Sequence, residues 1–182
     1  MKSRLILAAL MLGATLGCTN AKNAKNETGN AVENQDVNNH AAVADTHMAF
    51  DFTLKDLQGN DLSLSSLRGK YVILDFWGSW CKWCIKGFPE MKKAYEKYSD
   101  RLEILGVDCG DSEDVWRAAV SNHQLPWKHV YCPQENREVL QAYAIQGFPT
   151  KIIIDEKGQV VKEYIGEDPE FYTYLDSLME RK

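Results

Sequence analysis

The sequence predicts an α/β fold with a mixed central sheet flanked by helices over residues 49–182. Near-continuous apolar runs of strand length recur in this part of the chain, and segments with helical spacing lie between them. The last two of these runs flank the turn Glu156-Lys157-Gly158, as the strands of a hairpin do. Strands that alternate with helices and end in a hairpin indicate an α/β domain with both parallel and antiparallel pairs.

The first half of this domain is predicted to hold a hairpin, two buried strands and a long helix. Apolar and polar residues alternate over 50–54, and Asn60-Asp61 leads into a second short strand. The apolar run 71–76 indicates a strand covered on both faces. A helix is expected from there to about Tyr98, before a second buried strand at 102–107.

The second half adds a helix–strand insert, a further helix and the closing hairpin. Asp111 or Ser112 is expected to cap a helix with its apolar residues on one side. Asp168-Pro169 starts the last helix as a cap followed by proline. The elements between these two helices are expected, in chain order, at 129–131 (strand), 135–144 (helix), 150–155 (strand) and 159–165 (strand).

The composition excludes several functional classes. The 182 residues carry 21 Lys and Arg against 26 Asp and Glu, for a formal net charge of −5. This balance argues against a nucleic-acid partner, since phosphate neutralisation needs clustered basic residues. The five Cys are too few for a small disulfide-built protein of this length, but they suffice for one redox or metal site.

The first residues have the layout of an export signal. Lys2 and Arg4 precede an apolar, uncharged run over residues 5–16, which is too short to span a bilayer. The run ends at Gly17-Cys18 and resembles the lipobox of bacterial lipoproteins, with Thr15 as a departure from the usual Leu. We therefore predict a signal peptide at 1–17 and lipidation of Cys18. The alternative is a plain secretory signal with an incidental Cys.

Residues 18–48 are predicted to be a disordered tether behind the lipid-anchor Cys. Between residues 19 and 47 the composition is rich in Asn, Ala, Lys, Asp and Glu and lacks aromatic residues, so this segment cannot bury a core. A flexible chain of about 30 residues has an r.m.s. reach on the order of 30 Å, enough to hold a domain clear of a membrane.

A Cys-x-x-Cys pair follows the first buried strand. Cys81 and Cys84 face each other across one helical turn, so they can close a disulfide with little backbone movement. The start of a helix favours a thiolate on the first Cys, and Lys82 adds a nearby positive charge. Cys81 is therefore the predicted nucleophile, and Cys84 is placed to attack a mixed disulfide and release the partner.

These residues resemble the thioredoxin family. Asp-Phe-Trp-x-x-Trp-Cys-x-x-Cys from Asp75 is similar to its active-site motif, Pro89 stands where its active-site helix is kinked, and residues 147–150 look like its cis-proline loop. The stretch before the strand and the helix–strand insert are more similar to the exported TlpA/ResA branch. The resemblance covers about residues 49–182 and implies a thioredoxin-like fold.

The resemblance also implies roles for residues around the pair. A carboxylate in a buried strand is costly, so its pKa should rise. Asp75 looks like the buried general base for Cys84, unless it sits at an edge and points to water. A cis Phe148–Pro149 bond would expose backbone beside the thiols, where a substrate strand could pair, so Phe148, Pro149 and Thr150 are predicted substrate-binding residues.

Two tryptophans flank the nucleophile. Trp80 and Trp83 are predicted to form an apolar, substrate-binding rim over the disulfide, and the alternative is that they pack inside the domain. Trp83 departs from the family, which often has Pro before the second Cys.

The remaining cysteines each follow an apolar strand-like run. If those strands are parallel neighbours, Cys109 and Cys132 lie at the same end of the sheet, where a second disulfide is a prediction. The alternative is two buried free thiols. The four His show no ligand spacing relative to the CxxC pair, so no metal site is predicted.

The sequence therefore predicts an exported, membrane-anchored thiol–disulfide oxidoreductase without a cofactor. By resemblance it acts as a reductase on exported protein disulfides, with a membrane thiol as electron donor and apocytochrome c as one candidate substrate. Two alternatives are a thiol peroxidase on the same fold and a protein that binds a soft metal ion such as Cu(I). Peroxiredoxins usually carry Pro and Thr or Ser where this chain has Leu74 and Gly78, which counts against the first.

Overall fold

A computed structural model describes residues 47–181. The predicted signal peptide, Cys18 and nearly all of the predicted tether lie outside the described residues. Just before the predicted boundary at residue 49, His47 accepts a backbone hydrogen bond from Val160, and Met48 forms a bridge with Gln159. The first described contacts of the domain thus lie two residues earlier than predicted.

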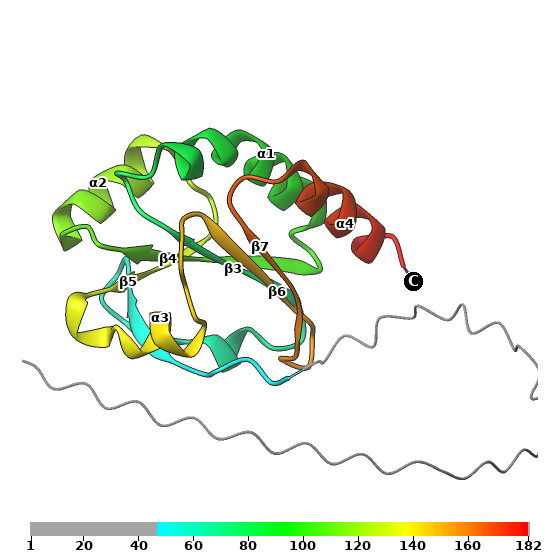
Figure 1. Ribbon diagram of the computed structural model, residues 1–182, viewed down its shortest axis with the longest axis horizontal. Coiled ribbons are helices and arrows are strands. Elements are labelled where there is room, and N and C mark those ends of the chain that lie inside the picture. Colours follow the sequence, from blue (N-terminus) through cyan, green and yellow to red (C-terminus); the bar gives the residue numbers. More distant parts are fainter. Residues whose placement is uncertain (1–46, 182) are drawn as a thin grey trace, which may run out of the picture. The chain divides into compact units, whose positions relative to one another are not determined.

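A seven-stranded mixed sheet occupies the centre of the domain, with the strand order β2-β1-β5-β4-β3-β6-β7 (Figure 1). β3, β4 and β5 are parallel neighbours, whereas the outer pairs are antiparallel. The predicted mixed sheet and both predicted hairpins are confirmed. The strands are β1 (Thr53–Asp56), β2 (Asp61–Ser63), β3 (Tyr71–Trp77), β4 (Leu102–Cys109), β5 (Lys128–Cys132), β6 (Thr150–Ile154) and β7 (Val160–Ile165).

Helices cover both faces of the sheet. α1, α2 and α4 pack on one face, and α3 and the 3-10 helix η1 pack on the other (Figure 1). The helix predicted at 135–144 is shorter than expected and follows a separate 3-10 turn, and Ala144 has a φ of 49°, which does not continue a right-handed helix. The helices are η1 (Leu64–Leu67), α1 (Lys82–Tyr98), α2 (Glu113–Asn122), η2 (Gln134–Asn136), α3 (Glu138–Ala142) and α4 (Pro169–Met179).

The two predicted helix caps differ in the structure. Asp168 caps α4 as expected, since its side chain accepts a hydrogen bond from the backbone N–H of Glu170 at 2.8 Å. Ser112 is the residue before α2, but its side chain makes no capping hydrogen bond. Asp111 instead turns its carboxylate toward the loop that precedes the CxxC pair.

β3 alternates between the two layers of the core. Ile73 and Trp77 belong to the cluster formed with α1, α2 and α4, and Leu74 and Phe76 belong to the cluster on the α3 side. Because successive side chains of a strand point to opposite faces, Asp75 points toward the layer of α1 and α4. The apolar run of this strand is therefore buried on both faces, as predicted.

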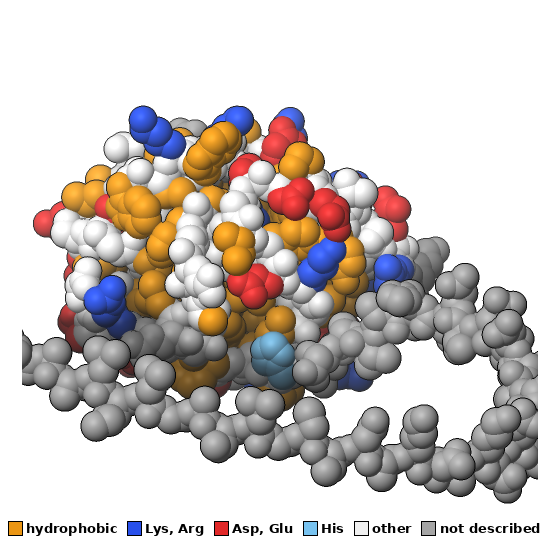
Figure 2. Space-filling view, in the orientation of Figure 1, with side chains coloured by type: hydrophobic (Ala, Val, Ile, Leu, Met, Phe, Trp, Pro, Cys, Tyr) orange, Lys and Arg blue, Asp and Glu red, His pale blue; other side chains and the backbone are white. Residues whose placement is uncertain are grey.

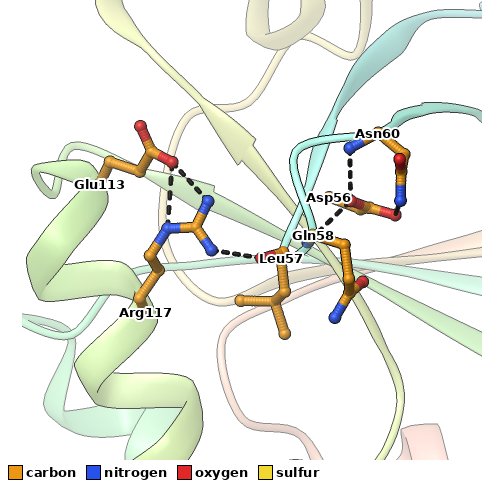
Figure 3. A network of polar contacts seen from close by, with 6 residues as sticks. All are labelled: Asp56, Leu57, Gln58, Asn60, Glu113 and Arg117. Atoms are coloured by element: carbon orange, nitrogen blue, oxygen red, sulfur yellow. Dashed lines mark hydrogen bonds and ion pairs between the residues drawn. The ribbon is translucent and has the colours of Figure 1, made fainter.

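The insert helix α2 is tied to the first hairpin (Figure 3). Arg117 donates to the backbone carbonyl of Leu57, and the guanidinium is held by Glu113, with Nε 3.0 Å from Oε1. In the turn between β1 and β2, which contains Leu57, the Asp56 carboxylate accepts a hydrogen bond from the backbone N–H of Asn60 at 2.8 Å. These contacts fix the β1–β2 turn against the helix.

The surface mixes charged and apolar groups. Figure 2 shows acidic, basic and hydrophobic side chains interspersed on one face of the domain. Among the large hydrophobic residues that are exposed, Trp80 and Trp83 lie next to the CxxC pair. In residues 47–181, no helix is both long and apolar enough to cross a membrane.

Candidate active site

The CxxC pair lies where β3 gives way to α1, as predicted. Cys81 is the N-cap residue of α1, and its sulfur is bonded to that of Cys84, with the two Cα atoms 5.3 Å apart. The Sγ of Cys81 also accepts a hydrogen bond from the backbone N–H of Cys84 at 3.1 Å. Free N–H groups and the positive end of the helix dipole stabilise an anion at this place, so the site favours a thiolate on Cys81.

The loop before Cys81 is held by a carboxylate that sequence reasoning assigned only to a helix cap. Asp111 accepts hydrogen bonds from the backbone N–H and the hydroxyl of Ser79 at 2.6 and 2.7 Å. The Tyr131 hydroxyl donates to the carbonyl of Asp111 at 3.0 Å. The helix start is therefore anchored to the ends of β4 and β5.

The two tryptophans are exposed but held differently. The Trp80 indole N–H donates to the carbonyl of Cys109 at 3.1 Å, and its ring meets Phe148 edge to face at 5.1 Å between centroids. Gly78 leaves the space for this indole, because a Cβ there would lie 2.5 Å from Nε1 of Trp80. Trp83 is 58% exposed, with the ammonium of Lys86 4.6 Å from its ring centre. Exposure favours the predicted rim over packing inside the domain.

The predicted cis-proline loop lies beside the end of β3. The Phe148–Pro149 peptide is cis, as predicted, and the Pro149 carbonyl accepts the backbone N–H of Gly166 at 2.7 Å. Thr150 is fully buried, and its hydroxyl donates to the carbonyl of Gly147 at 2.8 Å. The Thr150 side chain is thus buried and holds the loop together, and its substrate-binding role stays a prediction.

Asp75 is buried in the centre of the sheet, so the alternative of an edge position is wrong. It is 2% exposed, and it pairs in register with Lys151 of β6. Desolvation raises the pKa of Asp75 to about 6, while the charge of Lys151 lowers it and that of Glu167 raises it. Asp75 points into the same layer that contains Cys84, as a general base for that thiol requires.

Lys151 and Glu167 form a buried ion pair beside Asp75. Nζ of Lys151 lies 2.8 Å from Oε2 of Glu167, and the two side chains are 3% and 16% exposed. The Tyr172 hydroxyl donates to Oε1 of Glu167 at 2.9 Å. A Cβ at Gly87 would lie 2.4 Å from Oε2 of Glu167, so the missing side chain on α1 is what admits this carboxylate.

The two tryptophans line separate pockets. Trp83, Glu167 and Tyr172 line a pocket of about 470 Å³. Glu167 therefore connects the buried charged groups beside Asp75 with a pocket at the surface. Trp80 and Phe148 line a smaller pocket of about 160 Å³, which also contains both remaining cysteines.

Sequence reasoning missed the partners of Asp75. Lys151 interrupts the apolar run of β6. A charged residue within a predicted buried strand was the signal that could have identified it as a partner of Asp75. Glu167 lies between β7 and α4, where nothing in the local sequence separates it from a solvent-exposed loop residue. Asp108, at the end of β4, was also missed, and burial raises its pKa to about 8.

In residues 47–181, no group of three or more His, Cys, Asp and Glu is placed to hold an ion. His129 is buried and packs between Trp77 and Trp127. Burial lowers its pKa to about 3.

A thioredoxin-like sheet with a CxxC disulfide at the start of a helix defines the class of thiol–disulfide oxidoreductases. The chain belongs to the AhpC/TSA family, whose family profile matches residues 45–163.

Sequence relatives agree with this class. The chain is 35% identical over 117 residues to the thiol-disulfide oxidoreductase ResA of Bacillus cereus, a match that covers 64% of this chain and 66% of that relative. It is 34% identical over 126 residues to ResA of Bacillus subtilis, with 69% of each chain covered. The chain thus spans about two thirds of the length of these relatives.

Solved structures agree as well. The thioredoxin domain of a thiol-disulfide oxidoreductase from Bacteroides vulgatus superposes with a TM-score of 0.69 and 32% identity, covering 74% of this chain and 96% of that domain. A Chlorobium tepidum protein described as a putative thiol:disulfide interchange protein DsbE superposes with a TM-score of 0.67 and 26% identity, covering 72% and 92%. The predicted thioredoxin-like fold is confirmed.

Proposed function

We propose that the protein is a thiol–disulfide oxidoreductase that reduces disulfides of exported proteins through Cys81 and Cys84. The observation that carries this proposal is the position of Cys81. Its sulfur stands at the N-terminus of α1, accepts the N–H of Cys84 and is bonded to the Cys84 sulfur.

The reaction proceeds by two thiol–disulfide exchanges. The Cys81 thiolate attacks one sulfur of the substrate disulfide and releases the other sulfur as a thiolate, which leaves a mixed disulfide. Cys84 then loses its proton and attacks the Cys81 sulfur, which releases the second substrate thiol. The substrate gains two electrons, and the protein is left with the Cys81–Cys84 disulfide that the structure contains. A membrane thiol donor would restore the reduced pair.

Asp75 is the proposed acceptor of the Cys84 proton. With a pKa near 6, this carboxyl group is mostly ionised at neutral pH and still basic enough to take a proton from a thiol. Burial is the main cause of this raised pKa, and the charges of Lys151 and Glu167 adjust it in opposite directions. The proposed route for the proton out of the core ends at Glu167, which borders the pocket beside Trp83.

The proposed substrate surface surrounds the CxxC pair. Trp80 and Trp83 are more than half exposed, and Phe148 packs against Trp80 beside the cis-proline loop. An extended substrate segment can pair with the backbone of such a loop, with its disulfide presented to Cys81. These contacts supply apolar area without demanding one substrate sequence.

We further propose that Cys18 carries a lipid and that the domain acts outside the cytoplasm. The charged start, the apolar run and Gly17-Cys18 support this assignment, as does the similarity to relatives named ResA. Apocytochrome c thiols are then a candidate substrate, reached across the tether. Replacement of Cys18 by Ser should move the protein from the membrane fraction to the soluble fraction and abolish incorporation of labelled fatty acid.

The test of the central activity is trapping in cells that express the full chain. Cys84→Ser should stall at the mixed disulfide, so that proteins attached to Cys81 appear after acid quenching and separate again on reduction. Cys81→Ser/Cys84→Ser is the matched control and should capture none. Failure of the folded Cys84→Ser chain to capture a protein would contradict the proposal.

The direction of the reaction follows from equilibration in glutathione buffers. If the protein is a reductase, its reduction potential should lie well below that of proteins that oxidise thiols. A potential as high as about −120 mV would identify it as an oxidant.

Specific observations and measurements distinguish the two alternative functions, a thiol peroxidase and a soft-metal-binding protein, from the proposed one. A peroxidase needs a hydroxyl three residues before its reactive Cys, but here Gly78 lies beneath the Trp80 ring, and Leu74 is buried in the core. The protein should therefore consume hydroperoxides no faster than Cys81→Ser does. A soft-metal protein should retain a stoichiometric ion when purified without chelator and lose it in Cys84→Ser, and this result would favour metal binding over exchange.

A further inference from the structure

A second pair of cysteines lies at the ends of two central strands. Cys109 is the last residue of β4 and Cys132 the last residue of β5, and the two are direct partners in the parallel ladder. Neighbouring strands are about 4.8 Å apart. This separation lies inside the range of about 4.4 to 6.8 Å that a disulfide needs between Cα atoms.

The position at the strand ends leaves room for the sulfurs to meet. Gly110, with a φ of 95°, follows Cys109, and Pro133 follows Cys132, so the ladder ends at this pair. Both side chains belong to the same core cluster on the α3 side of the sheet. Neither backbone is held by a further ladder position beyond the pair.

The two thiols already interact. The hydrogen bond to Cys132 and then burial raise the pKa of the Cys109 thiol, and the same hydrogen bond lowers the pKa of Cys132. The Sγ atoms of Cys109 and Cys132 lie 3.5 Å from the carbonyls of Val107 and Asn136, respectively. The direction of these pKa shifts favours the thiolate form of Cys132 over that of Cys109.

The second pair borders a pocket. Both cysteines line the pocket of about 160 Å³ that Trp80, Arg137 and Phe148 also border. The pair lies in the core cluster on the α3 side of the sheet, whereas Cys81 and Cys84 lie in the cluster on the other side. It is thus a centre separate from the CxxC disulfide, although the Cys109 carbonyl holds the Trp80 indole.

We propose that Cys109 and Cys132 are a second redox-active pair, which low-molecular-weight disulfides oxidise to a disulfide across the floor of this pocket. The Cys132 thiolate attacks the small disulfide RSSR and forms a mixed disulfide while one RS⁻ leaves. Cys109 then loses its proton and attacks the Cys132 sulfur, and the second RS⁻ leaves. Two protein thiols are oxidised, one RSSR is reduced, and the proton from Cys109 ends on the released thiol.

This centre takes no part in the proposed exchange steps at Cys81 and Cys84. Its consequence is local: a bond between the two sulfurs would join β4 to β5 in the lining of the pocket that Trp80 and Phe148 also border. The state of the second pair would then be sensed at the proposed substrate surface through the backbone of Cys109.

The experiment follows the two pairs separately in one full-length chain. The protein is equilibrated in reduced and oxidised glutathione at a series of ratios, quenched with acid, alkylated and digested with trypsin. Cleavage at Arg and Lys places Cys109 in peptide 102–117 and Cys132 in peptide 129–137, while Cys81 and Cys84 fall in 71–82 and 83–86. We expect a cross-linked 102–117/129–137 species, about 2 Da lighter than the two thiol peptides together, which forms in oxidising buffer and disappears on reduction.

Several outcomes would overturn the proposal. Alkylation of both cysteines at every ratio would exclude the reaction, and separate glutathionylation of Cys109 and Cys132 without a cross-link would exclude the pair. In the control Cys81→Ser/Cys84→Ser, the cross-link should form to the same extent, and its loss would show that the oxidant is the CxxC disulfide. Because each pair has its own peptides, failure here leaves the proposed reductase activity unaffected, and the converse also holds.

Discussion

The two cysteine pairs of this domain occupy opposite faces of one sheet, and they are held by different kinds of structure. Cys81 and Cys84 are three residues apart at the start of a helix, so a backbone N–H and the helix dipole support a thiolate. Cys109 and Cys132 come from neighbouring strands, and the group that supports a thiolate there is the other thiol. All four cysteines are buried, so burial does not distinguish the catalytic thiol from a slowly reacting one. The group that stabilises the thiolate is what differs between the two pairs.

The surroundings of the two pairs differ in the same sense. The first pair is bordered by exposed tryptophans, and the layer beneath it contains Asp75 and the Lys151–Glu167 ion pair. The second pair lies under the rim of a small pocket among apolar side chains of the α3 face. The first pair is therefore flanked by exposed rings that a protein substrate could contact, whereas the second pair borders a pocket of about 160 Å³.

The largest expected difference between the pairs is catalytic. Cys81→Ser should lower the rate of protein-disulfide reduction by at least about a hundredfold, because it removes the nucleophile. Cys132→Ser lies on the other face of the sheet and should change this rate by less than about threefold. Steady-state reduction of a disulfide-containing protein by the two variants measures both effects, and equal losses would erase the distinction between the pairs.

The buried carboxylate of Asp75 should make the stability of the domain depend on pH. Asp75 ionises near pH 3.8 when unfolded and near pH 6 when folded, so the folded state binds more protons between these values. The free energy of unfolding should therefore fall as the pH rises from 4 to 6 and then stay constant. For a shift of about two pKa units, the total fall is about 3 kcal/mol.

Asp75→Asn should lack this part of the pH dependence. Denaturant unfolding of the oxidised chain at pH 4.5 and 7.5 compares the two proteins, and the difference between the two pH values cancels the constant cost of the amide. An identical pH dependence in wild type and variant would mean that Asp75 titrates alike in both states.

The ion pair behind Asp75 should tune the acid side of the rate profile. In Glu167→Gln, the charge of Lys151 acts on Asp75 without its counter-charge, so the pKa of Asp75 should fall further toward its ordinary value. The acid limb of the rate should then move to lower pH by on the order of one unit. Glu163→Gln on the exposed side of β7 is the matched control. An acid limb that moves equally in both variants, or in neither, would remove Glu167 from the mechanism.

The smallest effects are expected at the rim. Trp83→Ala should raise KM for a protein substrate a few-fold, leave kcat unchanged and alter the free energy of unfolding by less than about 0.5 kcal/mol, because this ring is exposed. Trp80→Ala should also destabilise the domain by about 1 to 2 kcal/mol, since it loses a hydrogen bond and the Phe148 contact. Equal destabilisation by both changes would indicate that Trp83 packs in the domain after all.

Much of the fold could be predicted because its signals are local. The apolar run that became β3, the turn at Gly158 and the cap at Asp168 each depend on neighbours in sequence. The length of α3 could not be predicted, because the positive φ of Ala144 belongs to a turn whose geometry the composition does not reveal.

The site was predictable in its sulfurs and not in its charges. Cys81, Cys84 and Asp75 lie in one stretch of ten residues with a recognisable pattern. Glu167 pairs with Lys151 beside Asp75 from a loop more than 90 residues away from Asp75 in the sequence, and Gly87 leaves the gap on α1 that admits its carboxylate. A contact that depends on a missing side chain in one element and a loop conformation in another has no signature in either segment alone.

The most direct measurement of the central claim is the rate of alkylation of each cysteine in the reduced chain as a function of pH, read from the tryptic peptides. The structure predicts that Cys81 reacts first by a wide margin at neutral pH, with a midpoint below the value of about 8.5 for a free Cys, and that Cys84, Cys109 and Cys132 react slowly. Faster alkylation of Cys84 or Cys132 than of Cys81 would contradict the assignment of Cys81 as the nucleophile.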